Sequence, residues 1–367
     1  PVRLVRCLTC EIEVPADCDF VIEGYVDPAE EQTVEGPFGD HTGFYSLEDR
    51  YPCFHVTAIT HRRDAVYPAT VVGVPPEEDA YIAQATERIF LAPIRLAVQP
   101  EVRDLWMPTA GTAHNLCVVS IDRRYEGQVH KVAQSLWGAG QMMFNKYLVV
   151  TGAETEIRSS DALAALVRRL DPARDLIAAE GVLDVLDHAT ATTGFGGKLA
   201  IDLTQAAARE ETPLRLPEGF EPCGGVESVT TAQAAKWRTL TLFVDRAAEC
   251  VDAAEFFARN PVQGVKFAVL FDREAEGLTA SELLWLAAAD SDPRRDVTVV
   301  GSVVVVDARS KRSGVAGHPA RFPNVTVASP ATVAAVDARW AEYGLGEPMA
   351  SPSERYRRLL LSDKAAW

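Results

Sequence analysis

The residues most able to do acid–base chemistry lie in one short segment, EGPFGDHTGFYS, at positions 35–46. Glycines and a proline at positions 36, 37, 39 and 43 predict a tight turn with a fixed backbone. Such a turn would place the carboxyl groups of Glu35 and Asp40 near each other. Two close carboxylates do not both ionise easily, so we expect the pKa of one of them to rise. A carboxylic acid that stays protonated near neutral pH can act as a general acid.

An ordinary hairpin turn with solvated acids would use the same residue types, because Gly, Pro and Asp are common in turns. His41 follows Asp40 directly, and its imidazole could line a pocket there or lie outside it. The residues alone leave both alternatives open.

A basic residue, Lys146, begins a predicted strand directly after the helical pattern that ends in WGAGQMMF. As a point charge it could bind a phosphate group. It could equally be a solvated lysine at a strand end. Lys266 occupies the same place in an internal repeat, which favours a structural role.

The spacings that resemble metal sites are weak. Cys7 and Cys10 have CxxC spacing, but residues three apart on a strand point to opposite faces, and no second pair stands nearby. His55 and His61 lie on one face of a predicted strand, too far apart to share an ion. We therefore predict no metal ligands in this chain.

The chain divides into four predicted parts. Residues 1–75 show short strands between Pro, Gly and Asp clusters, which predict a β-barrel or a β-sandwich. A barrel needs more strands than this segment supplies, so we expect an upstream part. Residues 76–112 predict a linking helix that Pro93 breaks or kinks. Residues 113–330 alternate strand and helix, and residues 331–367 predict a helical tail.

An internal repeat shapes the third part, because residues 145–175 resemble residues 265–296. The repeat predicts two similar α/β units that could share one extended sheet and act as an oligomerisation domain. Residues 205–236 show little periodicity and predict a long loop. The expected fold class is therefore α/β (α+β), with part of a β-barrel or sandwich ahead of the α/β domain.

Composition narrows the function classes. The 367 residues are 47% hydrophobic and 24% charged, which is typical of a globular protein. A net charge of -16 argues against non-specific binding to nucleic acid or anionic membranes. No apolar run is long enough to cross a bilayer, and seven cysteines do not suggest a disulfide framework. We expect a cytoplasmic protein.

The acid segment and its neighbours resemble a known family. EVPADCDFVIEGYVDP stands before EGPFGDHTGFYS, and PCFHVTAITHRRDAVYPATVVGVPPEED stands after it. LDPARD and LDHATATTGFGGKLAIDLT continue the pattern, so the match covers nearly all of residues 1–204. Together these segments are similar to the UbiD-like decarboxylases, which depend on prenylated flavin mononucleotide (FMN). The resemblance implies that residues 1–75 are the C-terminal part of a split, flavin-reductase-like β-barrel.

The resemblance implies roles for individual residues. Asp40 takes the position of the acid that donates a proton, and Glu35 that of its carboxylate partner. His41 and Lys146 become candidates for binding prenylated FMN. The family also uses a divalent metal (Mn or Mg), potassium and a network arginine, and those residues are expected upstream of this chain.

A finer resemblance points to one branch of the family. DAYIAQATERIFLAPIRL, GTAHNL, SLWGAGQMMFNKYLVV and PSERYRRLLL look like the branch of menaquinone biosynthesis through futalosine. The implied reaction is non-oxidative decarboxylation of 1,4-dihydroxy-6-naphthoate by a homo-oligomer. A separate upstream polypeptide could complete the enzyme. The alternatives are a non-catalytic assembly subunit, an inactive C-terminal fragment, or a small-molecule sensor built on the two α/β units.

Overall fold

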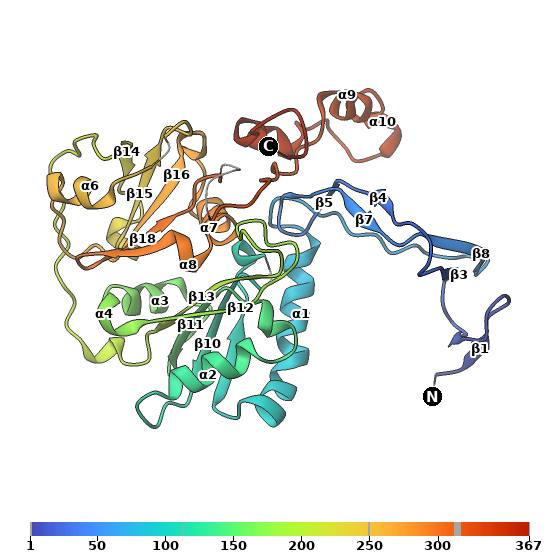
Figure 1. Cartoon of the computed structure of the whole chain (residues 1–367), viewed down its shortest axis with the longest axis horizontal. Coiled ribbons are helices and arrows are strands. Elements are labelled where there is room, and N and C mark those ends of the chain that lie inside the picture. Colours follow the sequence, from blue (N-terminus) through green and yellow to red (C-terminus); the bar gives the residue numbers. More distant parts are fainter. Residues whose placement is uncertain (1, 113, 249, 312–316, 367) are drawn as a thin grey trace. The chain divides into compact units, whose positions relative to one another are not determined.

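The computed structural model describes residues 2–112, 114–248, 250–311 and 317–366 (Figure 1). The expected domain boundary at residue 113 lies outside these residues. By their internal contacts, residues fall into two compact units, each treated by itself below. The N-terminal unit comprises Pro1–Phe38 and Ser46–Val71, and the C-terminal unit comprises Gly39–Tyr45 and Val72–Trp367.

The N-terminal unit is built from antiparallel strand pairs, as the alternating sequence predicts. The pairs are β1 (Leu4–Arg6) with β2 (Glu13–Pro15), β3 (Phe20–Val26) with β8 (Phe54–His61), and β4 (Thr33–Glu35) with β7 (Asp49–Tyr51). Two shorter strands, β5 (Phe38–Gly39) and β6 (Tyr45–Ser46), flank residues 40–44. The described strands form no closed barrel, so the split barrel stays a prediction.

The C-terminal unit begins with α1 (Glu78–Pro93), which continues as a π-helical turn, η1 (Ile94–Val98). Regular α-helix therefore ends at Pro93, which confirms the predicted break. The ring of a proline removes a backbone donor and crowds the preceding turn, so the hydrogen-bond pattern changes there.

The first α/β half of this unit is a five-stranded sheet in the order β12-β13-β11-β10-β9. Its strands are β9 (Val102–Trp106), β10 (Leu116–Ile121), β11 (Tyr147–Gly152), β12 (Leu176–Val182) and β13 (Phe195–Asp202). Its helices are η2 (Thr109–Gly111), α2 (Gln128–Trp137), η3 (Gly140–Phe144), α3 (Ser160–Val167), α4 (Pro172–Asp175) and η4 (Ala206–Ala208). Strands β10, β11 and β13 are parallel, whereas the edge strands β9 and β12 run antiparallel to their neighbours.

The second α/β half repeats this order as β14-β15-β16-β18-β17. Its strands are β14 (Val226–Thr230), β15 (Thr239–Val244), β16 (Phe267–Asp272), β17 (Val297–Val300) and β18 (Val303–Asp307). Its helices are α5 (Ala234–Trp237), α6 (Ala253–Arg259), η5 (Arg273–Ala275), α7 (Ala280–Ala289) and α8 (Pro293–Asp296). The internal repeat is confirmed, but the halves form two separate sheets and not one extended sheet.

The predicted loop at residues 205–236 is wrong in part. It contains β14 and α5, because β14 completes the edge of the second sheet by pairing with β15. Long-range pairing of this kind leaves little periodicity in a five-residue strand.

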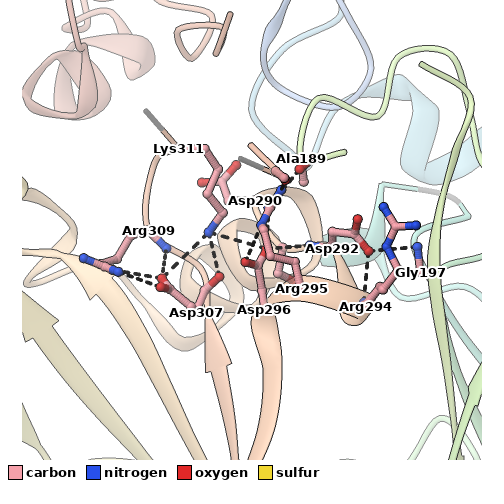
Figure 2. A network of polar contacts seen from close by, with 12 residues as sticks. Ala189, Gly197, Asp290, Asp292, Arg294, Arg295, Asp296, Asp307, Arg309 and Lys311 are labelled. Atoms are coloured by element: carbon pink, nitrogen blue, oxygen red, sulfur yellow. Dashed lines mark hydrogen bonds and ion pairs between the residues drawn. The ribbon is translucent and has the colours of Figure 1, made fainter. Parts of the chain in front are cut away.

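The two halves pack through a shared core and a polar seam. Leu170 and Leu203 of the first half lie in one buried cluster with Val304 and Val306 of the second. Figure 2 shows part of the seam, where Asp292 accepts a hydrogen bond of 2.8 Å from the backbone N–H of Gly197. A Cβ atom at position 197 would lie 2.2 Å from the backbone nitrogen of Arg294, so this close approach requires glycine.

The C-terminal tail carries α9 (Pro330–Ala338), α10 (Trp340–Tyr343) and a 3-10 helix, η6 (Pro352–Leu359). In the part of the chain that the structure describes, no helix combines the length and apolar character needed to span a bilayer.

Candidate active site

Residues 39–45, here called the acid loop, are held by the second α/β half. The indole N–H of Trp285 in α7 donates to the carbonyl oxygen of Thr42 at 2.7 Å. The backbone N–H of Thr326 donates to Gly43 at 2.9 Å, and that of Tyr45 donates to Asn324 at 3.0 Å. These bonds to distant segments fix the loop more firmly than its own turn could.

The acid loop also has an aromatic anchor. Phe44 is 3% exposed, and its ring centroid lies 4.2 Å from that of His188 and 5.3 Å from that of Trp285. Gly43 has a φ of 86°, and a Cβ atom there would lie 2.8 Å from the Trp285 ring. The glycine therefore serves both the turn and the packing.

Asp40 is buried within this loop and bonded through both oxygens. Its Oδ1 lies 3.0 Å from Nδ1 of His41, and its Oδ2 accepts a bond of 3.1 Å from the backbone N–H of Thr42. Burial acts to raise the pKa of Asp40, but the bond and charge of His41 and the bonds from Thr42 outweigh it. The pKa of Asp40 therefore lies below its usual value.

The pKa of His41 moves the other way. Burial acts to lower it, but the bond to Asp40 and the charges of Asp40, Asp184 and Asp79 raise it overall. Both shifts favour the charged pair, in which a protonated imidazole lies beside an ionised carboxylate. The expectation of a raised pKa does not hold for Asp40, because its close partner is a base and not a second acid.

Glu35 ends β4 with an exposed side chain in the N-terminal unit, whereas Asp40 belongs to the C-terminal unit. Pairing of these two carboxyl groups stays a prediction.

Two further residues meet His41 that sequence reasoning missed. His114 stands just before β10, and Asp184 just after β12. Because β12 runs antiparallel to β13, the carboxyl end of β12 lies at the same end of the sheet as the amino ends of β10, β11 and β13. There Nε2 of His114 lies 3.1 Å from Oδ2 of Asp184, and the His114 ring centroid lies 5.5 Å from that of His41. The strand pattern NLCVVSI, which begins beside His114, was the available signal for that residue, whereas no predicted strand marked Asp184.

Lys146, directly before β11, also lies at this end of the sheet, but it is not a solvated lysine. Its Nζ lies 2.6 Å from Oδ2 of Asp187, and the two side chains are 0% and 1% exposed. Lys198, nearby, donates to the carbonyl oxygens of Met143 at 2.6 Å and Asn145 at 2.7 Å. Burial and the charge of Lys146 lower the pKa of Lys198 to about 8, against the opposing charge of Asp187.

This arrangement places two buried amines beside a single carboxylate. The surplus of positive charge would suit a phosphate, which would have to open the ion pair between Lys146 and Asp187. Binding of a flavin phosphate by Lys146 stays a prediction.

Three groups of side chains in the described residues bring potential metal ligands within 4.8 Å of one another, although the sequence predicts none: His41 with His114 and Asp184, Cys7 with Cys10 and Glu23, and Glu30 with Cys53 and His55. The strand assumption for Cys7 and Cys10 is wrong, because β1 ends at Arg6 and both cysteines lie in the following turn. Glu23 already accepts backbone bonds from Leu8 at 2.8 Å and Thr9 at 2.6 Å, which accounts for that turn.

Comparison with known proteins agrees with this architecture. Residues 1–75 match the family model of the 3-octaprenyl-4-hydroxybenzoate carboxy-lyase Rift-related domain, and residues 80–203 match that of the C-terminal domain of the same enzyme. An uncharacterised protein of Aquifex aeolicus (strain VF5) is 48% identical over 222 residues, covering 60% of this chain and 46% of its own length. One of Archaeoglobus fulgidus is 44% identical over 221 residues, with the same coverage. The chain therefore spans less than half the length of these relatives.

A solved structure, vanillic acid decarboxylase of Sedimentibacter hydroxybenzoicus in its closed form, superposes with a TM-score of 0.50 at 26% identity. The match covers 60% of this chain and 47% of that one. The second α/β half follows the region that the family models match.

Proposed function

Because this chain belongs to the UbiD family of carboxy-lyases, we propose that its acid loop delivers the proton in the non-oxidative decarboxylation of an aromatic carboxylic acid. The observation that carries the proposal is Asp40. It is a buried carboxylate on an anchored loop, bonded to an imidazole. The sequence resemblance favours the role of proton donor for this residue.

The pKa shifts of Asp40 and His41 favour the protonation that such a step needs. When carbon dioxide leaves, the electrons of the broken C–C bond must form a new C–H bond with an incoming proton. His41 holds a proton at Nδ1, within 3.0 Å of Asp40, and can pass it to the carboxylate for delivery to carbon. Glu35 is the proposed partner that tunes Asp40.

We propose prenylated FMN as the cofactor. When bound, this flavin supplies an electron sink for the breaking bond. The buried amines of Lys146 and Lys198, balanced by the single carboxylate of Asp187, are a donor set that fits its phosphate. His41 would line the same pocket. A divalent metal, Mn or Mg, and a potassium ion belong to the same proposal, which rests for them on the family resemblance alone.

The substrate and assembly are proposals of the same kind. Resemblance to the menaquinone branch favours 1,4-dihydroxy-6-naphthoate as the substrate. A cytoplasmic homo-oligomer, formed through the two α/β halves and with or without a separate upstream polypeptide, is the proposed assembly.

The test uses the whole protein that contains this chain, purified from a host that makes prenylated FMN. Release of carbon dioxide is measured with 1,4-dihydroxy-6-naphthoate and, for comparison, with vanillate and 4-hydroxybenzoate. Turnover of the naphthoate supports the full proposal. If only vanillate or 4-hydroxybenzoate is turned over, the assignment to the menaquinone branch is wrong, but the proposed decarboxylase activity is still supported.

Native mass spectrometry of the same preparation tests the assembly. Flavin mass or a second polypeptide in the complex supports a working decarboxylase. An oligomer that contains only this polypeptide, without flavin and without activity on any of these acids, would overturn the proposal in favour of an assembly subunit or an inactive fragment.

A further inference from the structure

The cluster of His41, His114 and Asp184 has the composition of a transition-metal site. Two imidazoles and one carboxylate are the ligand set found in zinc and non-haem iron sites with open positions. One ligand atom from each residue lies within 4.8 Å of the others. Bonds of about 2.0–2.1 Å to a tetrahedral ion place its ligand atoms roughly 3.3 Å apart. Nε2 of His114 and Oδ2 of Asp184 are already 3.1 Å apart.

Two of the three ligands, His41 and Asp184, are held by a second partner. Nδ1 of His41 is bonded to Asp40, which leaves Nε2 as the nitrogen able to bind an ion. Oδ1 of Asp184 accepts a bond of 2.9 Å from the backbone N–H of Leu186, which leaves Oδ2 toward His114. Carboxylate and backbone partners of this kind orient the ligands in protein metal sites.

The surroundings carry more negative charge than the two imidazoles balance. The charges of Asp40, Asp184 and Asp79 all act on His41. Oδ2 of Asp79, in the first turn of α1, is buried and has no hydrogen-bond partner among the described residues. Buried carboxylate oxygens without a donor are costly, and a cation nearby would remove that cost.

We propose that His41, His114 and Asp184 bind a divalent transition-metal ion, with zinc as the best match to the ligand set. The ion would replace the direct contact between His114 and Asp184. Imidazole ligands disfavour magnesium and calcium, which prefer oxygen. All three ligands come from this chain, and the inference does not depend on the proposed decarboxylase activity.

A bound ion would also fix the tautomer of His41. With Nε2 bound to the metal, the remaining ring proton sits at Nδ1 and points to Asp40. Through the hydrogen bond from His41, the metal would thereby fix the position of the Asp40 carboxylate in the acid loop.

Cobalt(II) titration of the purified protein, followed by absorption spectroscopy, tests this site. Cobalt bound by nitrogen and oxygen gives visible d–d bands without the near-ultraviolet band of thiolate ligands. We expect such bands with wild-type protein, their loss in the His114→Ala and Asp184→Asn variants, and their retention in His130→Ala. His130 is an exposed histidine outside the cluster, so it is the matched control.

A double variant, Cys7→Ser with Cys10→Ser, separates the site from the cysteine turn and should keep the same spectrum. Zinc should raise the melting temperature of the wild type and of His130→Ala, but not of Asp184→Asn, whose melting without metal shows whether it folds. A spectrum with a thiolate band that the double cysteine variant removes would overturn the proposal. So would cobalt bands and zinc stabilisation that persist in both cluster variants, or no cobalt binding at all.

Discussion

The two α/β halves of the C-terminal unit share one scaffold. Both sheets have the same strand order. Both halves also have a short helix directly before the fourth strand in sequence, α4 before β12 and α8 before β17. Asp171 caps α4 and receives support from Asp175, whose Oδ2 accepts its backbone N–H at 2.8 Å. Asp292 caps α8 and Asp296 supports it in the same way at 2.7 Å.

The halves differ in the connection between their last two strands. In the second half, β17 ends at Val300 and β18 begins at Val303, so the turn is short. In the first half, residues 183–194 join β12 to β13 and carry Asp184, Asp187 and His188. The two halves thus share a scaffold, but only the first half has the longer loop that supplies Asp184 to the candidate site and Asp187 to Lys146.

The matched lysines show this most clearly. Lys146 has Asp187 from the long loop as its partner. Among the described residues, no carboxylate forms an ion pair with Lys266, and burial lowers its pKa. The lysine at this repeat position therefore has an ion-pair partner in the first half, whereas in the second half burial disfavours its charged form.

The largest effect should come from exchanging these lysines for methionine. Lys146→Met leaves Asp187 buried without its closest partner, so we expect a loss of about 3 kcal/mol in the free energy of unfolding. Lys266→Met should cost about 1 kcal/mol or less, because it removes an uncompensated buried charge. Urea unfolding of both variants measures the difference. Equal losses would contradict the distinction between the halves.

A glycine in the seam should have the next largest effect. Gly197→Ala pushes a methyl group against the backbone of α8, so we expect a loss of about 2–3 kcal/mol. Ser302, which takes the corresponding place in the second half, is exposed, and Ser302→Ala should change stability by about 0.5 kcal/mol or less. A mild Gly197→Ala variant would show that the two halves do not pack as described.

The first half alone should show a pH dependence that comes from Lys198. By strand register, the equivalent position in the second half is Val303, which does not titrate. Its folded-state pKa is about 8, below the usual 10.5. Between these values the unfolded chain keeps a proton that the folded chain has lost, so stability should rise with pH. Relative to Lys198→Met, the wild type should gain on the order of 2 kcal/mol across that window.

The measurement is urea unfolding of both proteins at several pH values from about 7 to 10, with the difference between them plotted against pH. Subtracting the variant removes the contributions of other titrating groups. A flat difference would mean that Lys198 is not held in a destabilising environment.

The smallest effect concerns the contact by which the second half holds the acid loop. Trp285→Phe removes the hydrogen bond to Thr42, so we expect a loss of about 1 kcal/mol and faster amide hydrogen exchange at Gly43 and Tyr45. Trp340→Phe also removes an indole bond, to Gly346 in the tail, and is the matched control. Equal exchange at these amides in both variants would show that Trp285 does not anchor the loop.

Much of the scaffold was predictable because its signals are local. Periodicity identified strands β10, β11 and β13 and helices α2 and α3 of the first half, but not strands β9 and β12. The similarity of residues 145–175 to 265–296 identified the repeat. Strand β14 was missed because a short edge strand is defined by its partner β15. The acid loop was found from its own residues, but its anchor Trp285 lies 243 positions from Thr42 and left no local signal.

The site was predictable only where its residues are adjacent in sequence. Asp40 and His41 are neighbours, whereas Asp184 reaches His114 only because β12 runs antiparallel to β13. The protonation of Asp40 was also misjudged, because the partner that decides it is an imidazole whose orientation depends on the folded loop.

The most direct test of the account is the rate of decarboxylation by the whole protein with Asp40→Asn, beside Asp49→Asn, an exposed acid of β7, as the control. We predict that Asp40→Asn lowers the rate by about 100-fold or more while its melting temperature stays near that of the wild type, and that Asp49→Asn is unaffected. A folded Asp40→Asn variant that releases carbon dioxide at a rate close to the wild type would contradict the role given to the acid loop.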